Sequence, residues 1–233
     1  MAGERADPMA TARAAMIVRQ LRARGIADER VLAVMAALRR EEFLPPDRRA
    51  LAYDDAALPV GSGQTISQPY IVARMTELVH AIAGDRILDI GTGTGYQAAV
   101  LADLGARVVT IERRPELAAS ALDRLTRMGY ADRIDVRVAD GSLGAPDGAP
   151  WDGIVVGAAA PSVPEALREQ LAIGARLVIP VGTRDRQELL WIERQGPTDW
   201  IEGSDGPCVF VPLVGAAGFA DGLQVGRRPE THG

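Results

Sequence analysis

Apolar residues recur at helical spacing in the first part of the chain. The clearest set lies at positions i, i+3, i+4 and i+7 on one helical face: Val31, Val34, Met35 and Leu38. Gly25 separates this helix from an earlier one that starts near Met9, and a Pro-Pro pair at 45–46 ends the helical run. We therefore expect residues 9–57 to form a helical N-terminal extension.

From residue 86 onward, short apolar runs alternate with helix-length stretches, after a helix expected at residues 69–83. Alternating strands and helices predict a mostly parallel sheet with helices on both faces. Since no helix-length stretch separates the last strands, the sheet should end antiparallel. Helices are expected at about 96–104, 115–128 and 163–171, and the seven strands at Arg86–Ile90, Arg107–Ile111, Ile134–Val138, Gly153–Gly157, Arg176–Val181, Glu188–Glu193 and Val209–Leu213.

The length and uniform composition indicate a single α/β domain. The 233 residues can bury one sizeable core, and neither a linker nor an internal repeat divides them. We expect this domain to cover residues 1–220, with residues 1–8 flexible and residues 221–233 forming a polar tail.

Composition excludes several classes of partner. A net charge of −5 disfavours nucleic acid, because phosphate binding usually needs a basic face. Cys208 is the only cysteine, and His80 and His232 lie far apart, so no metal-ligand spacing is present. The charged N-terminus lacks the apolar core of a signal peptide, and no stretch approaches the ~20 apolar residues of a membrane span. A cytoplasmic protein with no metal, nucleic acid or membrane partner is expected.

The first predicted strand leads into a glycine-rich turn in which Gly91, Gly93 and Gly95 alternate with other residues. Glycines let the backbone turn tightly at the end of a strand and approach a ligand closely. The third glycine comes one place earlier than in the dinucleotide-binding fingerprint, and no Lys-Ser/Thr follows as in a P-loop. The turn therefore indicates a ligand other than a common dinucleotide or nucleoside triphosphate.

Acidic residues stand near the ends of three successive predicted strands. Asp89 can serve the ammonium group of an amino-acid ligand, directly or through water, and Glu112 can accept hydrogen bonds from two ribose hydroxyls. Asp140, followed by Gly141, is placed to receive an adenine amino group. S-adenosylmethionine fits this set better than NAD, whose pyrophosphate needs a helix N-terminus. At any one position, a turn glycine or a helix-capping acid would give the same pattern.

Five segments in collinear order, between about Met16 and Gly215, carry a more specific signal. They are Leu58–Met75, Ile90–Ala98, Asp140–Gly144, Ala158–Pro161 and Phe210–Gly215. These segments resemble the protein-L-isoaspartate(D-aspartate) O-methyltransferase family. Gly-Gln-Thr-Ile-Ser-Gln-Pro is the most specific motif, since ordinary methyltransferases lack it. The resemblance implies a class I methyltransferase-like (Rossmann-like) fold, with a seven-stranded sheet whose last two strands have a changed order.

The resemblance also implies an activity. Members transfer a methyl group from S-adenosylmethionine to the free carboxylate of L-isoaspartyl residues in damaged proteins and peptides, which starts repair through a succinimide. That carboxylate, with an unperturbed pKa near ~4, is itself the nucleophile, so the enzyme must align it and strip it of water. By resemblance, Ser67 is the active-site serine. Gln64, Thr65, Ile66 and Ser67 wrap the cofactor, and Val211 and Pro212 pair with the substrate backbone.

Alternatives stay open for single residues and for the whole chain. Ser67, two residues before Pro69, also fits a helix N-cap, and Tyr96 and Gln97 fit packing as well as cofactor contact. The same chemistry could be dedicated to one peptide or precursor, giving an ester and then an aspartimide. A longer C-terminal extension than the about 18 residues after Gly215 would favour that reading. A catalytically idle domain that binds the cofactor is the remaining alternative.

Overall fold

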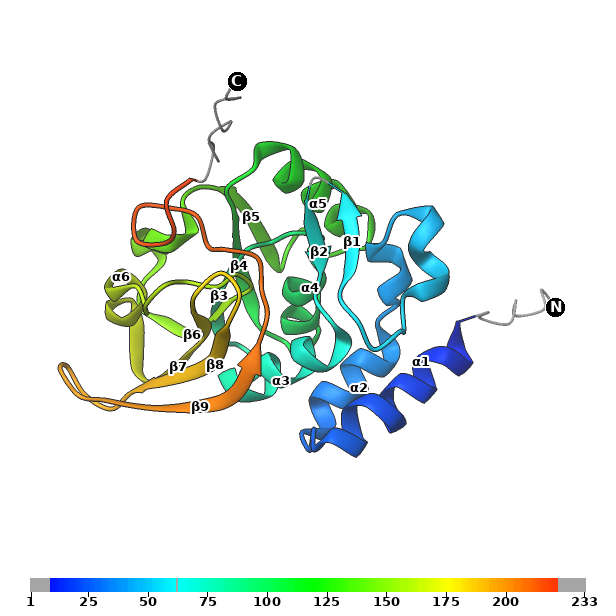
Figure 1. Ribbon diagram of the computed structural model, residues 1–233, viewed down its shortest axis with the longest axis horizontal. Coiled ribbons are helices and arrows are strands. Elements are labelled where there is room, and N and C mark those ends of the chain that lie inside the picture. The colour runs from blue at the N-terminus through cyan, green and yellow to red at the C-terminus, as the bar shows by residue number, and fades with distance from the viewer. Residues whose placement is uncertain (1–8, 62, 222–233) are drawn as a thin grey trace, which may run out of the picture.

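A seven-stranded sheet forms the centre of the computed structural model, which describes residues 9–61 and 63–221 (Figure 1). Its strand order is β5-β4-β3-β6-β7-β8-β9; the pairs from β5 to β7 are parallel, and β8 runs antiparallel to both of its neighbours. The expected antiparallel end is confirmed. The strands are β3 Arg86–Ile90, β4 Arg107–Glu112, β5 Ile134–Val138, β6 Trp151–Val156, β7 Leu171–Gly182, β8 Gln187–Arg194 and β9 Trp200–Cys208.

Both faces of the sheet are covered, as the apolar runs predict. In β3, Ile87 enters the core shared with the N-terminal extension, whereas Leu88 and Ile90 enter the core on the other face. This alternation follows from the two-residue period of a strand. Figure 1 shows α6 and the N-terminal extension on opposite sides of the sheet. The helices that follow the extension are α3 Pro69–Val79, α4 Tyr96–Asp103, α5 Pro115–Arg127 and α6 Glu165–Glu169.

The N-terminal extension is helical, as expected from its periodicity. Asp28 caps α2 by accepting a hydrogen bond from the Arg30 amide at 2.8 Å, and Val31 and Met35 are buried beneath it. Its regular elements are α1 Ala10–Met16, a π-helical turn at Ile17–Leu21, α2 Glu29–Ala37 and 3-10 turns at Arg22–Arg24, Arg40–Phe43 and Pro46–Leu51. A small antiparallel pair of strands, β1 Leu58–Gly61 and β2 Gln64–Ile66, follows the extension and leads into α3.

The predicted last strand is wrong. The seventh strand is β9, and Val209–Leu213 instead forms an isolated parallel bridge in which Pro212 pairs with Ala159. Because β9 contains Gly203, Gly206 and Pro207, its composition is that of a loop, and only its pairing with β8 along the sheet edge makes it a strand.

Several helix boundaries also differ from the prediction. The helix α3 ends at Val79, four residues early, because His80 adopts a left-handed conformation with φ 58°. The helix α6 is shorter than expected, because Leu171 already belongs to β7. The short strands β1 and β2 are not among the strands expected from the sequence.

Some expectations concern residues beyond the described ranges. The expected flexibility of residues 1–8 lies outside them, as does the polar tail except for Asp221. Within residues 9–61 and 63–221, no helix is long and apolar enough to cross a membrane.

Candidate active site

A cavity of about 700 Å³ opens at the carboxyl ends of β3, β4 and β6. Open α/β sheets bind their ligands at this edge, where the chain leaves successive parallel strands. The segment from β2 to α3 forms one wall of the cavity, and the segment after β9 forms another. Eleven of the residues singled out from the sequence line it together: Gln64, Thr65, Ile66, Ser67, Asp89, Gly91, Gly93, Glu112, Gly141, Val211 and Pro212.

The glycine turn takes the conformation that its composition predicts. Gly91, Gly93 and Gly95 have φ values of 91°, 51° and 86°, a region that other residues rarely adopt. Gly95 does not line the cavity; a Cβ there would lie 3.0 Å from Cδ1 of Leu125 in α5. Its role in the turn is therefore to let α4 and α5 pack closely, while the other two glycines face the cavity.

Asp89 lines the cavity and has one carboxylate oxygen without a hydrogen-bond partner among the described residues. Its Oδ2 accepts a 2.7 Å hydrogen bond from the Thr110 hydroxyl, which in turn accepts one from Thr92 at 2.7 Å. Its Oδ1 is buried and has no hydrogen-bond partner among the described residues. Burial raises the pKa of Asp89 to about 7, against the Thr110 hydrogen bond, which lowers it. A buried oxygen of this kind suits a ligand cation, which supports the expected ammonium contact.

Glu112 is held by two backbone amides. Its Oε2 accepts from Gly93 and its Oε1 from Arg114, both at 3.1 Å, so the carboxylate is fixed between the glycine turn and the start of the next loop. Each carboxylate oxygen can accept a further hydrogen bond. The arrangement therefore leaves Glu112 able to receive a pair of hydroxyls, as a ribose offers.

Asp140 lies beside the main cavity rather than in its wall. It lines an adjoining hollow of about 360 Å³ that shares Arg113 and Val214 with the cavity. Burial alone would raise the pKa of Asp140, but hydrogen bonds from the Ala216 amide and from Ser142 outweigh this and lower it. Gly141, which does line the cavity, could not carry a Cβ without approaching Ile90 Cγ2 to 2.5 Å.

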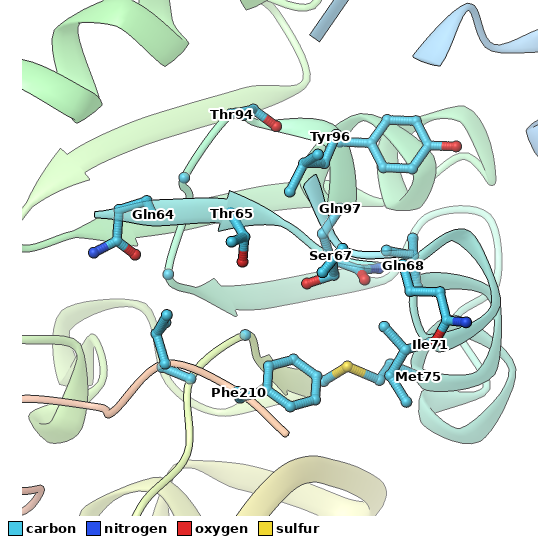
Figure 2. A pocket seen from close by; sticks show the side chains of 18 of the residues that line it. Gln64, Thr65, Ser67, Gln68, Ile71, Met75, Thr94, Tyr96, Gln97 and Phe210 are labelled. Atoms are coloured by element: carbon cyan, nitrogen blue, oxygen red, sulfur yellow. The ribbon is translucent and has the colours of Figure 1, made fainter. Parts of the chain in front are cut away.

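Ser67 faces the cavity without a capping role. The N-cap position of α3 is Gln68, and no side chain caps that helix, so the N-cap alternative for Ser67 is wrong. Its hydroxyl makes no hydrogen bond with the described part of the chain, whereas its carbonyl oxygen accepts a 2.7 Å bond from Arg40. Figure 2 shows Thr65 and Ser67 turned toward the same space, with Phe210 and Met75 across it.

Tyr96 and Gln97, which follow the glycine turn, differ in their surroundings. The Tyr96 ring points away from the cavity (Figure 2) and packs edge-on against Phe43, with ring centroids 5.1 Å apart. The Gln97 amide donates a 2.8 Å hydrogen bond to the Thr76 hydroxyl and lies behind Ser67. Tyr96 is thus a packing residue, and Gln97 joins α4 to α3 at the cavity wall.

The segment after β9 crosses the carboxyl end of the sheet (Figure 1) and exposes backbone to the cavity. Ala159 donates to the Val211 carbonyl at 2.8 Å and accepts from the Leu213 amide at 2.7 Å. These bonds fix one side of the segment; the carbonyls of Phe210 and Pro212 have no hydrogen-bond partner within the described ranges. Val209, at the rim, is 79% exposed. One edge of the segment is therefore free to pair with a peptide.

Two features of the site escape sequence reasoning. Thr110 lies in the interior of β4, where a threonine reads as an ordinary strand residue, and Arg40 sits in an arginine-rich stretch typical of a solvated surface. Both are fully buried and act through partners distant in sequence. No group of His, Cys, Asp or Glu that could hold a metal ion occurs in the part of the chain that the structure describes.

Comparisons with known families place the chain among carboxyl methyltransferases. The model of the family "Protein-L-isoaspartate(D-aspartate) O-methyltransferase (PCMT)" matches residues 12–218. A protein-L-isoaspartate O-methyltransferase of Marinobacter nauticus is 52% identical over 89% of this chain and 94% of its own. One of Methanoculleus marisnigri is 50% identical over 92% of this chain and 96% of its own.

Solved structures agree with the sequence relatives. A protein-L-isoaspartate O-methyltransferase structure with 28% identity superimposes with a TM-score of 0.78 and covers 88% of this chain and 67% of that one. A Plasmodium falciparum protein solved in complex with S-adenosyl-L-homocysteine has 24% identity and a TM-score of 0.74, over 87% of this chain and 98% of that one. At 24% identity, the likeness to the Plasmodium falciparum protein shows a shared fold and no more.

Proposed function

The chain belongs to the protein-L-isoaspartate(D-aspartate) O-methyltransferase family, and we propose that its cavity holds S-adenosylmethionine beside an isoaspartyl carboxylate, with Ser67 at their junction. The protein is an S-adenosylmethionine-dependent enzyme that methylates the free carboxylate of L-isoaspartyl residues in damaged proteins and peptides. The observation that carries the placement is the Ser67 hydroxyl, which faces the cavity and has no partner in the described chain.

The residues at the strand ends fit the cofactor. Asp89 supplies the unpartnered oxygen for the ammonium group, and Glu112 receives the ribose hydroxyls while two amides hold it in place. Asp140 borders the adjoining hollow and Gly141 lines the main cavity beside it, which is where the adenine is placed, and the positive-φ glycines let the backbone come close. When bound, S-adenosylmethionine supplies a sulfonium methyl group that an oxygen nucleophile can displace in line.

The chain's own contribution to the reaction is alignment. The Ser67 hydroxyl donates a hydrogen bond to one oxygen of the substrate carboxylate, which leaves the other oxygen as the nucleophile and adds no charge. Phe210, Met75 and Ile71 line the same region with apolar surface, so water is excluded from the carboxylate. Because the carboxylate is already ionised at neutral pH, no general base is required.

General repair, rather than a single dedicated target, fits the substrate segment best. The free carbonyls of Phe210 and Pro212, on either side of Val211, can pair with the main chain of any peptide, since main-chain groups do not vary with sequence. A catalytically idle domain is disfavoured because Ser67, Asp89 and Glu112 are all present and face one cavity. We further propose that the enzyme forms one domain, acts in the cytoplasm and needs no nucleic acid, membrane or metal partner.

The deciding experiment offers labelled S-adenosylmethionine with two synthetic peptides, one with L-isoaspartate and its twin with normal aspartate. We expect base-labile label on the isoaspartyl peptide alone. Label on neither peptide, with cofactor binding intact, would point to a dedicated target or an idle domain. Backbone pairing implies that the enzyme tolerates different sequences around the isoaspartate. A third peptide, with different flanking residues, tests this tolerance.

A further inference from the structure

Arg40 is a buried cation that joins the N-terminal extension to the active-site segment. Its side chain is fully enclosed, yet no carboxylate pairs with it within residues 9–61 and 63–221. Instead, Nε donates to the carbonyl of Ala52 and Nη2 to the carbonyl of Ser67, both at 2.7 Å. The guanidinium carbon lies 4.8 Å from the centre of the Tyr96 ring, at the start of α4.

Burying an arginine without a carboxylate partner costs free energy, so the position of Arg40 calls for an explanation. Burial lowers the pKa of the Arg40 guanidinium, since a charged group loses its water there, while Tyr96 raises it. An arginine stays protonated in spite of such a shift, and its planar fork fixes the direction of two acceptors at once. One of those acceptors is the carbonyl of the residue whose hydroxyl faces the cavity.

We propose that Arg40 is a positioning residue for methyl transfer, which acts through the backbone of Ser67. By holding the carbonyl, it fixes the peptide plane between β2 and α3, and so the direction in which the Ser67 hydroxyl points. The N-terminal extension is in this way part of the catalytic apparatus, not only a cover for the sheet. The inference rests on the proposed role of Ser67.

The test compares Arg40→Lys and Arg40→Met with the unchanged enzyme. A lysine ammonium cannot reproduce the two-pronged geometry, so we expect kcat to fall about tenfold in Arg40→Lys and roughly 100-fold in Arg40→Met, as for small misplacements of a reacting group. The Kd for S-adenosylhomocysteine should change less than about threefold, because Arg40 does not line the cavity. Loss of affinity equal to the loss of kcat would overturn the proposal.

A double variant separates positioning from general stability. If Arg40 acts through Ser67, adding Arg40→Met to Ser67→Ala should lower kcat by less than about threefold beyond Ser67→Ala alone, because the two effects are not independent. Full multiplication of the two losses would contradict the inference. Unchanged kcat in Ser67→Ala itself would instead remove the proposed role of Ser67, so the two failures are distinguishable.

Tyr53→Phe is the matched control in the same extension. The Tyr53 hydroxyl donates to Glu41 and accepts from Arg13 at 3.1 Å, and neither contact involves Ser67. We expect this variant to lower the melting temperature while it keeps kcat. If Tyr53→Phe lost as much kcat as Arg40→Lys, the effect of Arg40 would be that of a loosened extension, and the proposal would fail. Where Arg40→Met does not fold, Arg40→Lys carries the comparison.

Discussion

Ser67 is held in place by a hydrogen bond to its backbone carbonyl, and its hydroxyl takes no part in fixing it. The carbonyl is held by Arg40, whereas the hydroxyl makes no hydrogen bond with the described residues. A hydroxyl left free in this way can donate to a substrate oxygen without first breaking a bond inside the protein. The same division holds at Asp89, where one oxygen is bound by Thr110 and the other is left for a ligand.

Replacing Ser67 by alanine should lower turnover much more than cofactor affinity. The hydroxyl contributes to alignment of the carboxylate, so we expect kcat to fall by about 10²-fold while the Kd for S-adenosylhomocysteine changes less than about threefold. Single-turnover methylation and calorimetric binding measure the two effects. Ser204→Ala, which removes a hydroxyl bonded to Glu188 at 2.8 Å, is the control and should keep full activity. Unchanged turnover in Ser67→Ala would sink the assigned role.

Cofactor binding should weaken as the pH falls through the pKa of Asp89. That pKa is raised by burial to about 7, so in the free protein the carboxyl carries a proton below pH 7 and loses it above. The ammonium pairs with the ionised form, and the Kd for S-adenosylhomocysteine should therefore rise by up to about tenfold per pH unit below pH 7 and level off above it. Asp89→Asn should bind more weakly and show a flat profile over pH 5.5–8. A wild-type profile that is equally flat would contradict the ammonium contact.

The raised pKa of Asp89 also affects the free energy of folding. The resulting pH dependence is opposite in sign to that of most carboxylates. An unfolded aspartate has a pKa near ~3.9, below the folded value, so the folded state binds the proton more tightly. The contribution of Asp89 to stability is therefore greatest at acid pH and is lost as the pH rises from about 4 to about 7.

At the scale of elements, an ion-pair network ties the edge strand β9 to the rest of the molecule. Arg74 of α3 makes a forked contact with Asp205 of β9, with bonds of 2.8 and 2.5 Å from Nε and Nη2, and a 2.6 Å bond to Glu77. Glu77 in turn accepts from the amides of Ala27 and Asp28 at 2.8 and 2.9 Å. Arg74 and Glu77 together thus connect the sheet edge, α3 and the N-terminal extension.

Arg74→Met should destabilise the protein, because it leaves Glu77 and Asp205 partly buried without their cation. Their side chains are 15% and 17% exposed. Loss of charged hydrogen bonds of this kind costs about 1–3 kcal/mol, which corresponds to a fall in melting temperature of roughly 2–12 °C for a chain of this size. Arg127→Met, which breaks a pair whose partners are both 69% exposed, should shift it by less than about 1 °C. Equal shifts in the two variants would show that β9 does not depend on this network.

The elements that the sequence predicts correctly are those whose signal is local. The strands β3 and β4 are mostly apolar, β5 alternates apolar with charged residues, and Asp89, Glu112 and Asp140 follow from them because they are tied to strand ends. The strand β9 could not be predicted, since its pairing with β8 outweighs its own composition. Arg40 could not be predicted either, because its partner Ser67 is 27 residues away and only the fold brings them together.

At the scale of the whole molecule, the cavity lies between three parts of the chain. The strand ends, the segment 64–68 and the segment 207–214 each contribute walls, so a ligand in the cavity contacts all three. A ligand that binds only the folded state stabilises it by mass action. Cofactor occupancy should therefore be visible in the stability of the entire protein.

S-adenosylhomocysteine should raise the melting temperature and NAD should not. At 100 times its Kd, a ligand stabilises by about 2.7 kcal/mol, which corresponds to roughly 5–11 °C here. The pyrophosphate of NAD would meet Asp89 and Glu112, both buried acids, and should be rejected. Thermal unfolding with each ligand at the same concentration measures this. An equal shift with NAD would be incompatible with the cavity as assigned.

The free edge of the segment 209–213 has a consequence for the choice of damaged sites. Only backbone is offered there, by the carbonyls of Phe210 and Pro212, while Ala159 occupies the other side. Under the proposed pairing, a substrate must bring an extended stretch whose own amides are released from secondary structure. Lesions in loops, termini and transiently opened segments meet this condition, whereas a lesion inside an intact helix waits for local unfolding. The rate of local unfolding around each damaged site, more than the surrounding sequence, would then determine the order in which the sites of a substrate protein are methylated.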